Sequence, residues 1–182
     1  MTDGRQPGAP RILLSEECDL WRAILKGDPE PLVREAVNAV ARDQGFAADL
    51  DTEVSVTLTD DAEVREVNRE WRGKDKPTNV LSFPMSDLAP GDAPGPLLGD
   101  LVLAAETCER EAAEEGKSAA DHVRHLLVHG MLHLLGFDHE TDEDAEDMES
   151  AEIRILAGLG IPDPYGDAEF VADQRTNERL PS

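Results

Sequence analysis

The sequence predicts an α+β fold, in which a small mixed β-sheet of about four strands packs with about five helices. Three observations favour it: short apolar or alternating runs typical of strands, apolar residues at helical spacing, and an early alternation of strands and helices that ends in helices alone. With 182 residues, 40% of them hydrophobic, the chain can bury a core. We expect one domain over residues 1–182, with an ordered core at about 10–165 and flexible tails at 1–9 and 166–182.

The first third of the chain alternates strands and helices. The apolar run at residues 11–14 predicts a first strand, and apolar residues within 18–26 indicate a packed turn of helix. Residues 28–45 open on Asp-Pro, with Asp as N-cap and Pro as the first helical residue, and end on glycine. Residues 52–59 alternate in polarity and predict a half-buried strand. The residues expected on the buried face of the helix are Leu32, Val33, Ala36, Val37 and Val40.

A helix and two strands are predicted next. Residues 60–73 begin with a capping-box pattern and end on glycine, and the apolar side of this helix holds Val64, Val67 and Trp71. The proline-bounded stretch at 76–84 contains a strand, which the prolines place at an edge or at strand ends. After a loop rich in Pro, Gly and Asp, the apolar run at 97–104 predicts a buried strand.

Three helices are expected in the last part of the chain. The first covers residues 106–115. Ser118 caps the second and Thr141 the third, each with an acidic residue three positions on. The expected core contacts of the second helix are Val123, Leu126, Leu127, Met131 and Leu134. Those of the third are Met148, Ala151, Ile155, Leu156 and Leu159.

The second of these helices carries the pattern H-x-x-x-H-x-x-G-x-x-H. His129 and His133 are four residues apart and share one helix face. Gly136 is suited to the left-handed residue that ends a helix, so a turn there can bring His139 back to the other two. Three imidazoles and one open position are typical of a catalytic zinc site, whereas a fourth protein ligand closes a structural site. The sequence therefore predicts one Zn²⁺ ion on these three histidines.

Four neighbouring residues have more than one interpretation. His122 and His125 lie on the same helix stripe, but no hinge or third ligand goes with them, so we interpret them as ordinary helix residues or at most as supports facing the metal or substrate. Asp138 either orients a ligand histidine or satisfies its own backbone in the turn. Gly130 stands where metzincin proteases carry the glutamate that acts as general base, which argues against a peptidase.

Composition narrows the function classes. A formal charge of −23 predicts a soluble protein that avoids non-specific contact with nucleic acid and membranes. The first ten residues have no apolar core, so we expect no signal peptide, and no apolar run approaches the roughly 20 residues that span a bilayer. Cys18 and Cys108 are isolated, as expected of reduced thiols in a cytoplasmic protein.

One stretch of note is locally positive. Residues 65–76 hold five basic side chains against three acidic ones. A solvated helix face explains most such clusters. In a chain this acidic, the exception is more informative than usual.

Three blocks of sequence, in their order, resemble the bacterial YbeY family of metal-dependent endoribonucleases. The first is Asn68–Pro84 (NREWRGKDKPTNVLSFP) and the second is Leu98–Val102 (LGDLV). The third is His129–His139, followed by Met148-Glu149, Leu159-Gly160 and Asp163-Pro164-Tyr165. The resemblance spans about residues 30–165.

The resemblance implies a fold similar to that of zinc hydrolases, with a zincin-like helix bearing the first two ligands. It implies a zinc ion on the three matching histidines and an important arginine at Arg72. It also implies action on single-stranded ribosomal RNA, near the 3′ end of 16S rRNA, and a part in 70S ribosome quality control.

The chemistry fits phosphodiester cleavage. Zinc on three histidines lowers the pKa of a bound water towards about 7 or polarises a phosphoryl oxygen. The guanidinium fork of Arg72 matches two phosphate oxygens, so zinc and Arg72 are expected to clamp the scissile phosphate, with Arg69, Lys74 and Lys76 as further RNA contacts. The sequence leaves open whether a water or the ribose 2′-hydroxyl is the nucleophile.

The acidic charge constrains how RNA is bound. Residues 104–152 hold fifteen acidic side chains against three basic ones, whereas binding to phosphates draws on a basic surface. RNA therefore enters along residues 65–76, or the ribosome or a basic ribosomal protein supplies the remaining positive charge. We expect weak, salt-sensitive binding to isolated RNA and no DNA or membrane partner.

Two other functions compete with the nuclease. One is a non-catalytic ribosome assembly factor in which zinc only braces the fold, and the open fourth position argues against it. The other is a zinc hydrolase of another substrate such as peptides, and Gly130 argues against that.

Overall fold

Four strands form one mixed sheet in the computed structural model, which describes residues 8–165. The strand order is β1-β2-β4-β3. β1 (Arg11–Glu16), β2 (Glu53–Thr59) and β4 (Leu97–Ala104) are parallel, and β3 (Val80–Pro84) pairs antiparallel with β4 at one edge. The predicted α+β class with a mixed four-stranded sheet is confirmed.

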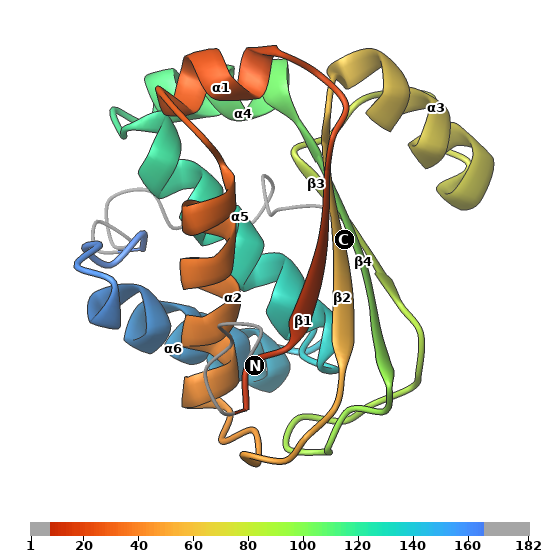
Figure 1. The fold of residues 1–182 in the computed structure, drawn as a ribbon, viewed down its shortest axis with the longest axis vertical. Helices are drawn as coiled ribbons and strands as arrows, with labels where there is room; N and C mark the ends of the chain where they lie inside the picture. The colour runs from red at the N-terminus through yellow and green to blue at the C-terminus, as the bar shows by residue number, and fades with distance from the viewer. Residues whose placement is uncertain (1–7, 166–182) are drawn as a thin grey trace, which may run out of the picture.

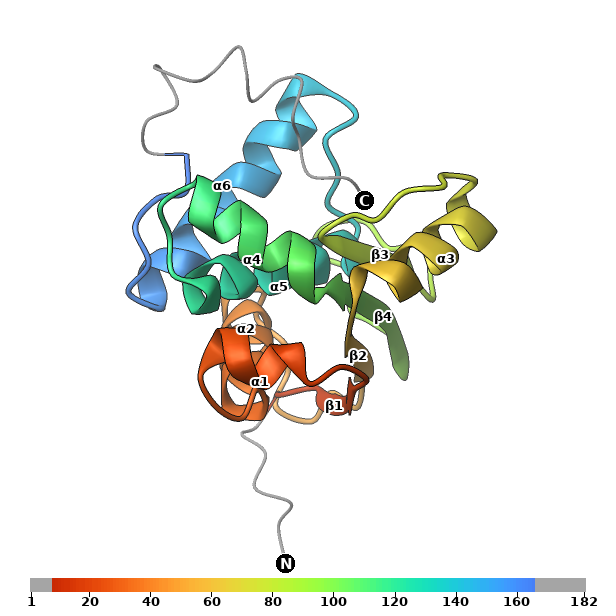
Figure 2. The ribbon, with the colours of Figure 1, turned by 90° about the horizontal axis from the view of Figure 1, so that it is seen from above.

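Helices cover the two faces of the sheet unequally (Figure 1). One side carries α2 (Glu30–Asp43), α5 (Ala119–Leu134) and α6 (Asp142–Gly158), with α1 (Leu20–Leu25) and α4 (Ala105–Glu114) at one end. The other side carries α3 (Asp61–Arg72), as Figure 2 shows from above. The described residues thus contain six helices rather than about five, because the packed turn at 18–26 closes into the short helix α1.

The main core lies between the sheet and α2, α5 and α6. Alternate residues of β2 and β4 face it, including Val56, Leu58 and Leu101, all fully buried. The residues predicted for the buried faces of α2 and α5 are all buried, and those of α6 are buried except Leu159, which is partly buried. Among the described residues, no helix combines the length and apolar character that crossing a bilayer requires.

A smaller cluster lies under α3 on the opposite face. Val64 is buried there against Leu81 and Ala104. The prediction that Trp71 is on the apolar side of this helix is wrong, since 73% of Trp71 is exposed. The end of α3 projects away from the body of the sheet (Figures 1 and 2), so the Trp71 ring meets only the edge of the Phe83 ring on β3 and stays largely in solvent. Asn68 is buried instead, and its amide donates to the Lys76 carbonyl at 2.9 Å.

Two expectations for the start of the chain change. The helix predicted with Asp28 as N-cap begins one residue later, with Pro29 as N-cap and Glu30 as the first helical residue, and the Asp28 carboxylate accepts from the Glu30 amide at 3.0 Å. Ala9 was expected in a flexible lead but is only 7% exposed, because this part of the chain packs against the backbone at Phe46. The rest of both predicted tails, residues 1–7 and 166–182, lies outside the described residues.

Candidate metal centre

α5 is the helix that places the first two histidines. The Ser118 hydroxyl accepts from the Asp121 amide at 3.1 Å, which satisfies an otherwise unpaired helix N–H and sets the start of the helix. Its predicted core contacts lock the helix between the sheet and its neighbours. The positions of His129 and His133 on the helix surface are therefore set by packing on several sides.

Gly136 makes the turn that follows α5. Its φ of +100° lies in the region that favours glycine, as predicted. A Cβ atom at this position would collide with the carbonyl oxygen of Leu88, so the loop before β4 also packs against this glycine. The turn redirects the chain so that His139 reaches the two histidines of the helix.

The three histidines form one group. One nitrogen from each of His129, His133 and His139 lies within 4.8 Å of the other two, a spacing that could hold a metal ion. The Nε2 atoms of His129 and His133 are 3.0 Å apart. The His129 ring is buried and the other two rings are half-buried, so the group is reached from one side.

A buried glutamate on α6 holds the group from behind. Glu152 is 1% exposed, and its Oε2 atom lies 3.1 Å from Nδ1 of His129 and 3.0 Å from Nε2 of His125. The Tyr165 hydroxyl donates to the other oxygen, Oε1, at 3.0 Å. Burial raises the pKa of Glu152, but the hydrogen bonds from the two histidines outweigh it and hold the pKa well below its ordinary value. The side chain is therefore a carboxylate.

This carboxylate determines the tautomer of His129. A carboxylate only accepts, so Nδ1 of His129 must carry the proton and donate it to Glu152. In the neutral ring the lone pair is then on Nε2, the atom that faces His133. A metal-bound histidine commonly has its second nitrogen on a carboxylate in this way.

The neutral form of His133 also favours metal binding. Burial lowers its pKa to about 3, helped by the neighbouring His129 and His139. The ring is neutral at pH 7, which is the form that binds a cation. A donor set of neutral imidazoles backed by a carboxylate suits a transition metal, zinc among them.

A cavity opens beside the group, between the end of β3 and the Gly136 turn. Its volume is about 320 Å³, and its lining includes His133, Ser82, Ser86 and Asp138. The Ser82 hydroxyl is buried without a partner among the described residues. The cavity therefore borders the histidine group directly through His133.

Gly130 allows α5 to approach the sheet closely. It faces the sheet, and a Cβ atom there would lie 2.8 Å from Leu101 Cδ2 and 3.3 Å from Ser82 Oγ. A glutamate at this position would have to displace both side chains. Glycine stands where the metzincin pattern has glutamate, and at this position α5 packs closely against β3 and β4.

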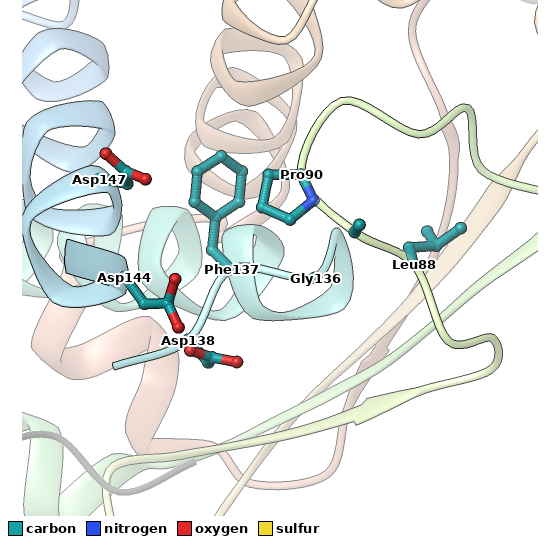
Figure 3. Close-up of a pocket in the computed structure, with 8 residues that line it drawn as sticks. Leu88, Pro90, Gly136, Phe137, Asp138, Asp144 and Asp147 are labelled. Carbon is teal, nitrogen blue, oxygen red and sulfur yellow. The ribbon is translucent and has the colours of Figure 1, made fainter. Parts of the chain in front are cut away.

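The space on the other side of the turn is acidic (Figure 3). A second hollow of about 300 Å³ is lined by three carboxylates, those of Asp138, Asp144 and Asp147, with Phe137 and Pro90 among the apolar residues. These carboxylates disfavour a phosphate there. An anionic substrate would therefore approach the histidines from another direction.

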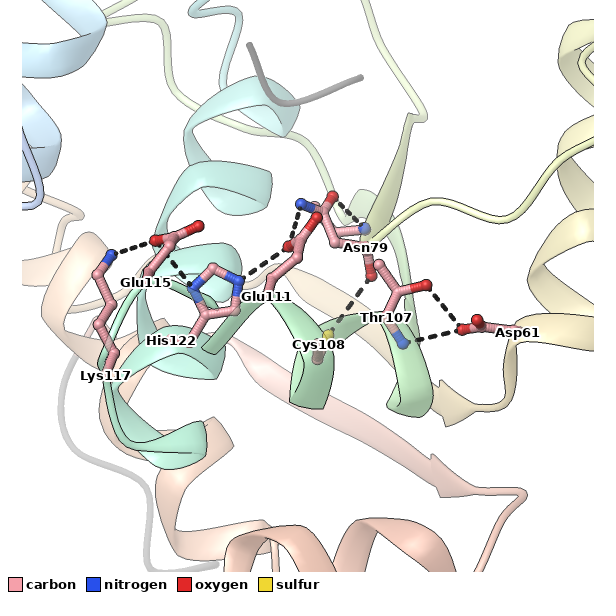
Figure 4. Close-up of polar contacts among 9 residues, drawn as sticks. Asp61, Asn79, Thr107, Cys108, Glu111, Glu115, Lys117 and His122 are labelled. Carbon is pink, nitrogen blue, oxygen red and sulfur yellow. Dashed lines mark hydrogen bonds and ion pairs between the residues drawn. The ribbon is translucent and has the colours of Figure 1, made fainter. Parts of the chain in front are cut away.

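A polar network ties the start of β3 to α4 and α5 (Figure 4). His122 Nε2 lies 2.9 Å from Glu111 Oε1, which also accepts from the Asn79 amide at 2.9 Å. The Asn79 side-chain oxygen accepts from the Val80 amide at 2.6 Å. His122 is thus part of a brace between elements and is not in the metal group. Cys108 borders this network as a free thiol whose pKa burial raises, as expected of a structural cysteine.

The basic stretch lies on another element. Arg72 is half-buried at the end of α3, and Lys74 and Lys76 are exposed in the loop that follows. Because α3 covers the opposite face from α5, the structure places Arg72 and the histidines on elements that flank the edge strand β3. Arg69 forms an ion pair with Glu66, so this candidate RNA contact already has an acidic partner.

Most of the chain matches one known protein family. The family model for "Endoribonuclease YbeY" matches residues 21–160. This chain belongs to the endoribonuclease YbeY family. A protein named Endoribonuclease YbeY from Rhodopseudomonas palustris is 48% identical over 174 residues, which cover 94% of this chain and 98% of that protein. Another of that name, from Agrobacterium fabrum, is 62% identical over 117 residues, 64% of this chain and 70% of that protein.

A solved structure supports the fold of this YbeY-family chain. The solution structure of TM1509 from Thermotoga maritima is similar, with a TM-score of 0.53 and 24% identity, over 92% of this chain and 93% of that one. At this identity the likeness concerns the fold alone.

Sequence reasoning missed one residue of the YbeY-family site and underrated another. Glu152 was not singled out, although an acidic residue between the apolar positions Met148 and Ile155 is a signal of a buried, partnered charge. His125 shares that carboxylate and so supports His129 from a distance. For Asp138, the contact observed is with the Glu140 amide at 3.2 Å, which is the contact of a turn residue.

Proposed function

We propose that this protein is a zinc-dependent endoribonuclease that cleaves single-stranded RNA. Its proposed role is maturation of the 3′ end of 16S rRNA and quality control of ribosomes in the cytoplasm. The observation that carries the proposal is the group of His129, His133 and His139, held from behind by Glu152 and open towards a cavity. Membership of the YbeY family supports the choice of RNA as substrate.

The residues around the three histidines hold and orient the groups that would bind the metal. A zinc ion, when bound, supplies a Lewis acid and lowers the pKa of a coordinated water. Glu152 keeps the Nε2 lone pair of His129 directed at the group. Ser82 lines the cavity beside the group, with its hydroxyl buried against Gly130 of α5.

Arg72 is proposed to neutralise charge on the RNA. It forms no ion pair within residues 8–165, so its guanidinium is available to a phosphate. Since Arg72 and the histidines flank β3, a strand that meets both has to pass across this edge of the sheet. A flexible single strand can follow such a path more easily than a duplex.

The ribosome is the proposed partner. The chain has a formal charge of −23, and carboxylates line the hollow beside the Gly136 turn. Apart from the phosphate at the histidine group, phosphate contacts are therefore expected on the side of residues 65–76, and a ribosomal protein or the ribosome supplies further positive charge.

The decisive experiment measures bound metal and RNA cleavage on the same samples. The substrates are a single-stranded RNA with the 3′-terminal sequence of 16S rRNA, a duplex of equal length and the matching single-stranded DNA. We expect about one zinc per chain and cleavage of the single-stranded RNA alone, with both lost in His133→Ala. The control His122→Gln changes a histidine of the same helix outside the group and should retain both.

Two outcomes would contradict the nuclease. Cleavage by folded His133→Ala at the wild-type rate would remove the metal from the reaction. A folded, zinc-loaded wild type that binds ribosomes without cutting RNA would support the non-catalytic assembly factor.

A further inference from the structure

An exposed tryptophan stands at the end of α3. Trp71 is 73% exposed, the largest exposed fraction among the large hydrophobic residues of the described chain. Its ring meets the Phe83 ring edge-on, with centroids 6.4 Å apart and planes at 61°. Phe83 is on β3 and packs with the small cluster under α3. The indole is therefore supported from one side while most of its surface faces solvent.

Positive charge gathers next to this ring. Arg72, Lys74 and Lys76 follow Trp71 closely and form no ion pair within residues 8–165. The other basic side chains of the stretch, Arg65 and Arg69, are already paired with Asp75 and Glu66. In a chain with a formal charge of −23, this end of α3 thus combines an exposed aromatic ring with basic residues close to it in sequence that form no ion pair within residues 8–165. Phosphate is the complementary charge.

The surroundings of Trp71 favour a nucleic acid over a protein partner. The exposed Glu70 precedes it and residues 72–76 carry no large apolar side chain, so the apolar surface at this end of α3 consists of Trp71 with the half-buried Phe83 and is small for a partner helix or sheet. A nucleobase needs one accessible ring face and nearby cations, and every base can stack in this way. The base must be unpaired, because a duplex hides its base faces.

We propose that Trp71 stacks on an unpaired base of single-stranded RNA, while Arg72, Lys74 and Lys76 hold the adjoining phosphates. The contact rests on the proposed function and adds a binding subsite to it. It lies on the face of the sheet opposite to the histidines, next to β3. The strand is thus gripped on one side of β3 and presented for cleavage on the other.

Tryptophan fluorescence can test the contact, because only one of the two tryptophans of the chain is accessible to an added oligonucleotide. Trp21 is fully buried and Trp71 is largely exposed. The zinc-loaded protein is titrated with a single-stranded 2′-O-methyl oligoribonucleotide, whose integrity is checked afterwards, and with its duplex. We expect the single strand to quench the emission of Trp71 and the duplex to leave it unchanged. Trp71→Phe should bind but lose the quenching.

Fluorescence anisotropy of a labelled single-stranded oligonucleotide measures how much Trp71 contributes to the binding affinity. Trp71→Ala should weaken binding roughly 5- to 150-fold, the range expected for loss of one base–aromatic stack, and Trp71→Phe should recover most of it. The matched control is Leu13→Ala, which removes a 56% exposed apolar side chain from β1, the far edge of the sheet, and should bind as wild type does.

The possible failures can be told apart. Wild-type affinity in Trp71→Ala, or equal quenching by the duplex, would overturn the subsite, while cleavage that still depends on His133 would leave the proposed nuclease intact. If Trp71→Ala instead binds the oligonucleotide normally but loses binding to ribosomal proteins, the surface is a protein contact and the subsite is also overturned. Absence of RNA cleavage with intact quenching would contradict the nuclease and keep the subsite.

Discussion

Replacing Glu152 by glutamine should weaken metal binding while the fold survives. The side chain keeps its shape but loses the charge that two histidines share at a single oxygen, 3.0 and 3.1 Å away. The amide oxygen accepts more weakly, or the NH₂ group turns towards His129 and removes the preference for a lone pair on its Nε2 atom. Loss of such a support typically lowers metal affinity about 10- to 100-fold, equivalent to about 1.4–2.8 kcal/mol.

The assay is zinc competition with a chelating dye, combined with unfolding measured with and without metal. Because a ligand that binds only the native state stabilises it according to its affinity, the zinc-induced gain in unfolding free energy should shrink by the same 1.4–2.8 kcal/mol or so. Glu146→Gln, an exposed residue on the same helix, is the control for loss of one negative charge. Tyr165→Phe removes only the donor to Oε1 and should have a smaller effect.

The reasoning would be refuted if folded Glu152→Gln bound zinc as tightly as Glu146→Gln. A spectroscopic check separates support of the ligand from general stability. In the cobalt-substituted protein, the visible spectrum should change in Glu152→Gln and stay the same in Glu146→Gln, because the spectrum reports the geometry of the ligands.

Four further changes have defined outcomes. Gly136→Ala should lower both the melting temperature and the zinc content, because alanine is strained at a φ of +100°. Leu126→Ala, which empties a fully buried site on α5, should reduce the free energy of unfolding by about 2–5 kcal/mol in urea titrations. Glu111 has a lowered pKa, since hydrogen bonds from His122 and Asn79 outweigh the effect of burial. Its stabilisation should thus be present above its unfolded pKa of about 4.3 and be lost as the pH falls through the folded value, a dependence that Glu111→Gln removes in unfolding curves taken at several pH values. Arg72→Ala should slow RNA cleavage and reduce its salt dependence without changing zinc content, and a wild-type rate would exclude Arg72 from contact with the RNA.

Local features of the site could be predicted from the sequence. The start of α5 at Ser118 and its end near Gly136 depend on contacts between residues three or four apart. The same short range sets the relation of His129 to His133, and the hinge accounts for the return of His139. The strand and helix faces that form the core follow from periodicity in the same way.

Trp71 and Glu152 show where local reasoning fails. Both lie at positions that the helical repeat directs towards the inside, but the apolar Trp71 is exposed, whereas the charged Glu152, which its residue type would place outside, is buried. The difference arises because α3 runs out beyond the sheet, whereas α6 packs against α5. The partners of Glu152 are 23 and 27 residues away in sequence, so no pattern within one helix identifies them.

The sequence by itself thus determined the α+β class, the limits of most elements and the three histidines, because periodicity, capping and ligand spacing act over a few residues. Only the tertiary structure decided what supports the histidines and where the basic stretch stands. Packing of α6 against α5 brings Glu152 behind His129, and the position of α3 places Arg72 across the edge strand from the metal group. Such arrangements depend on which faces of distant elements are buried together, and spacing along the chain does not encode them directly.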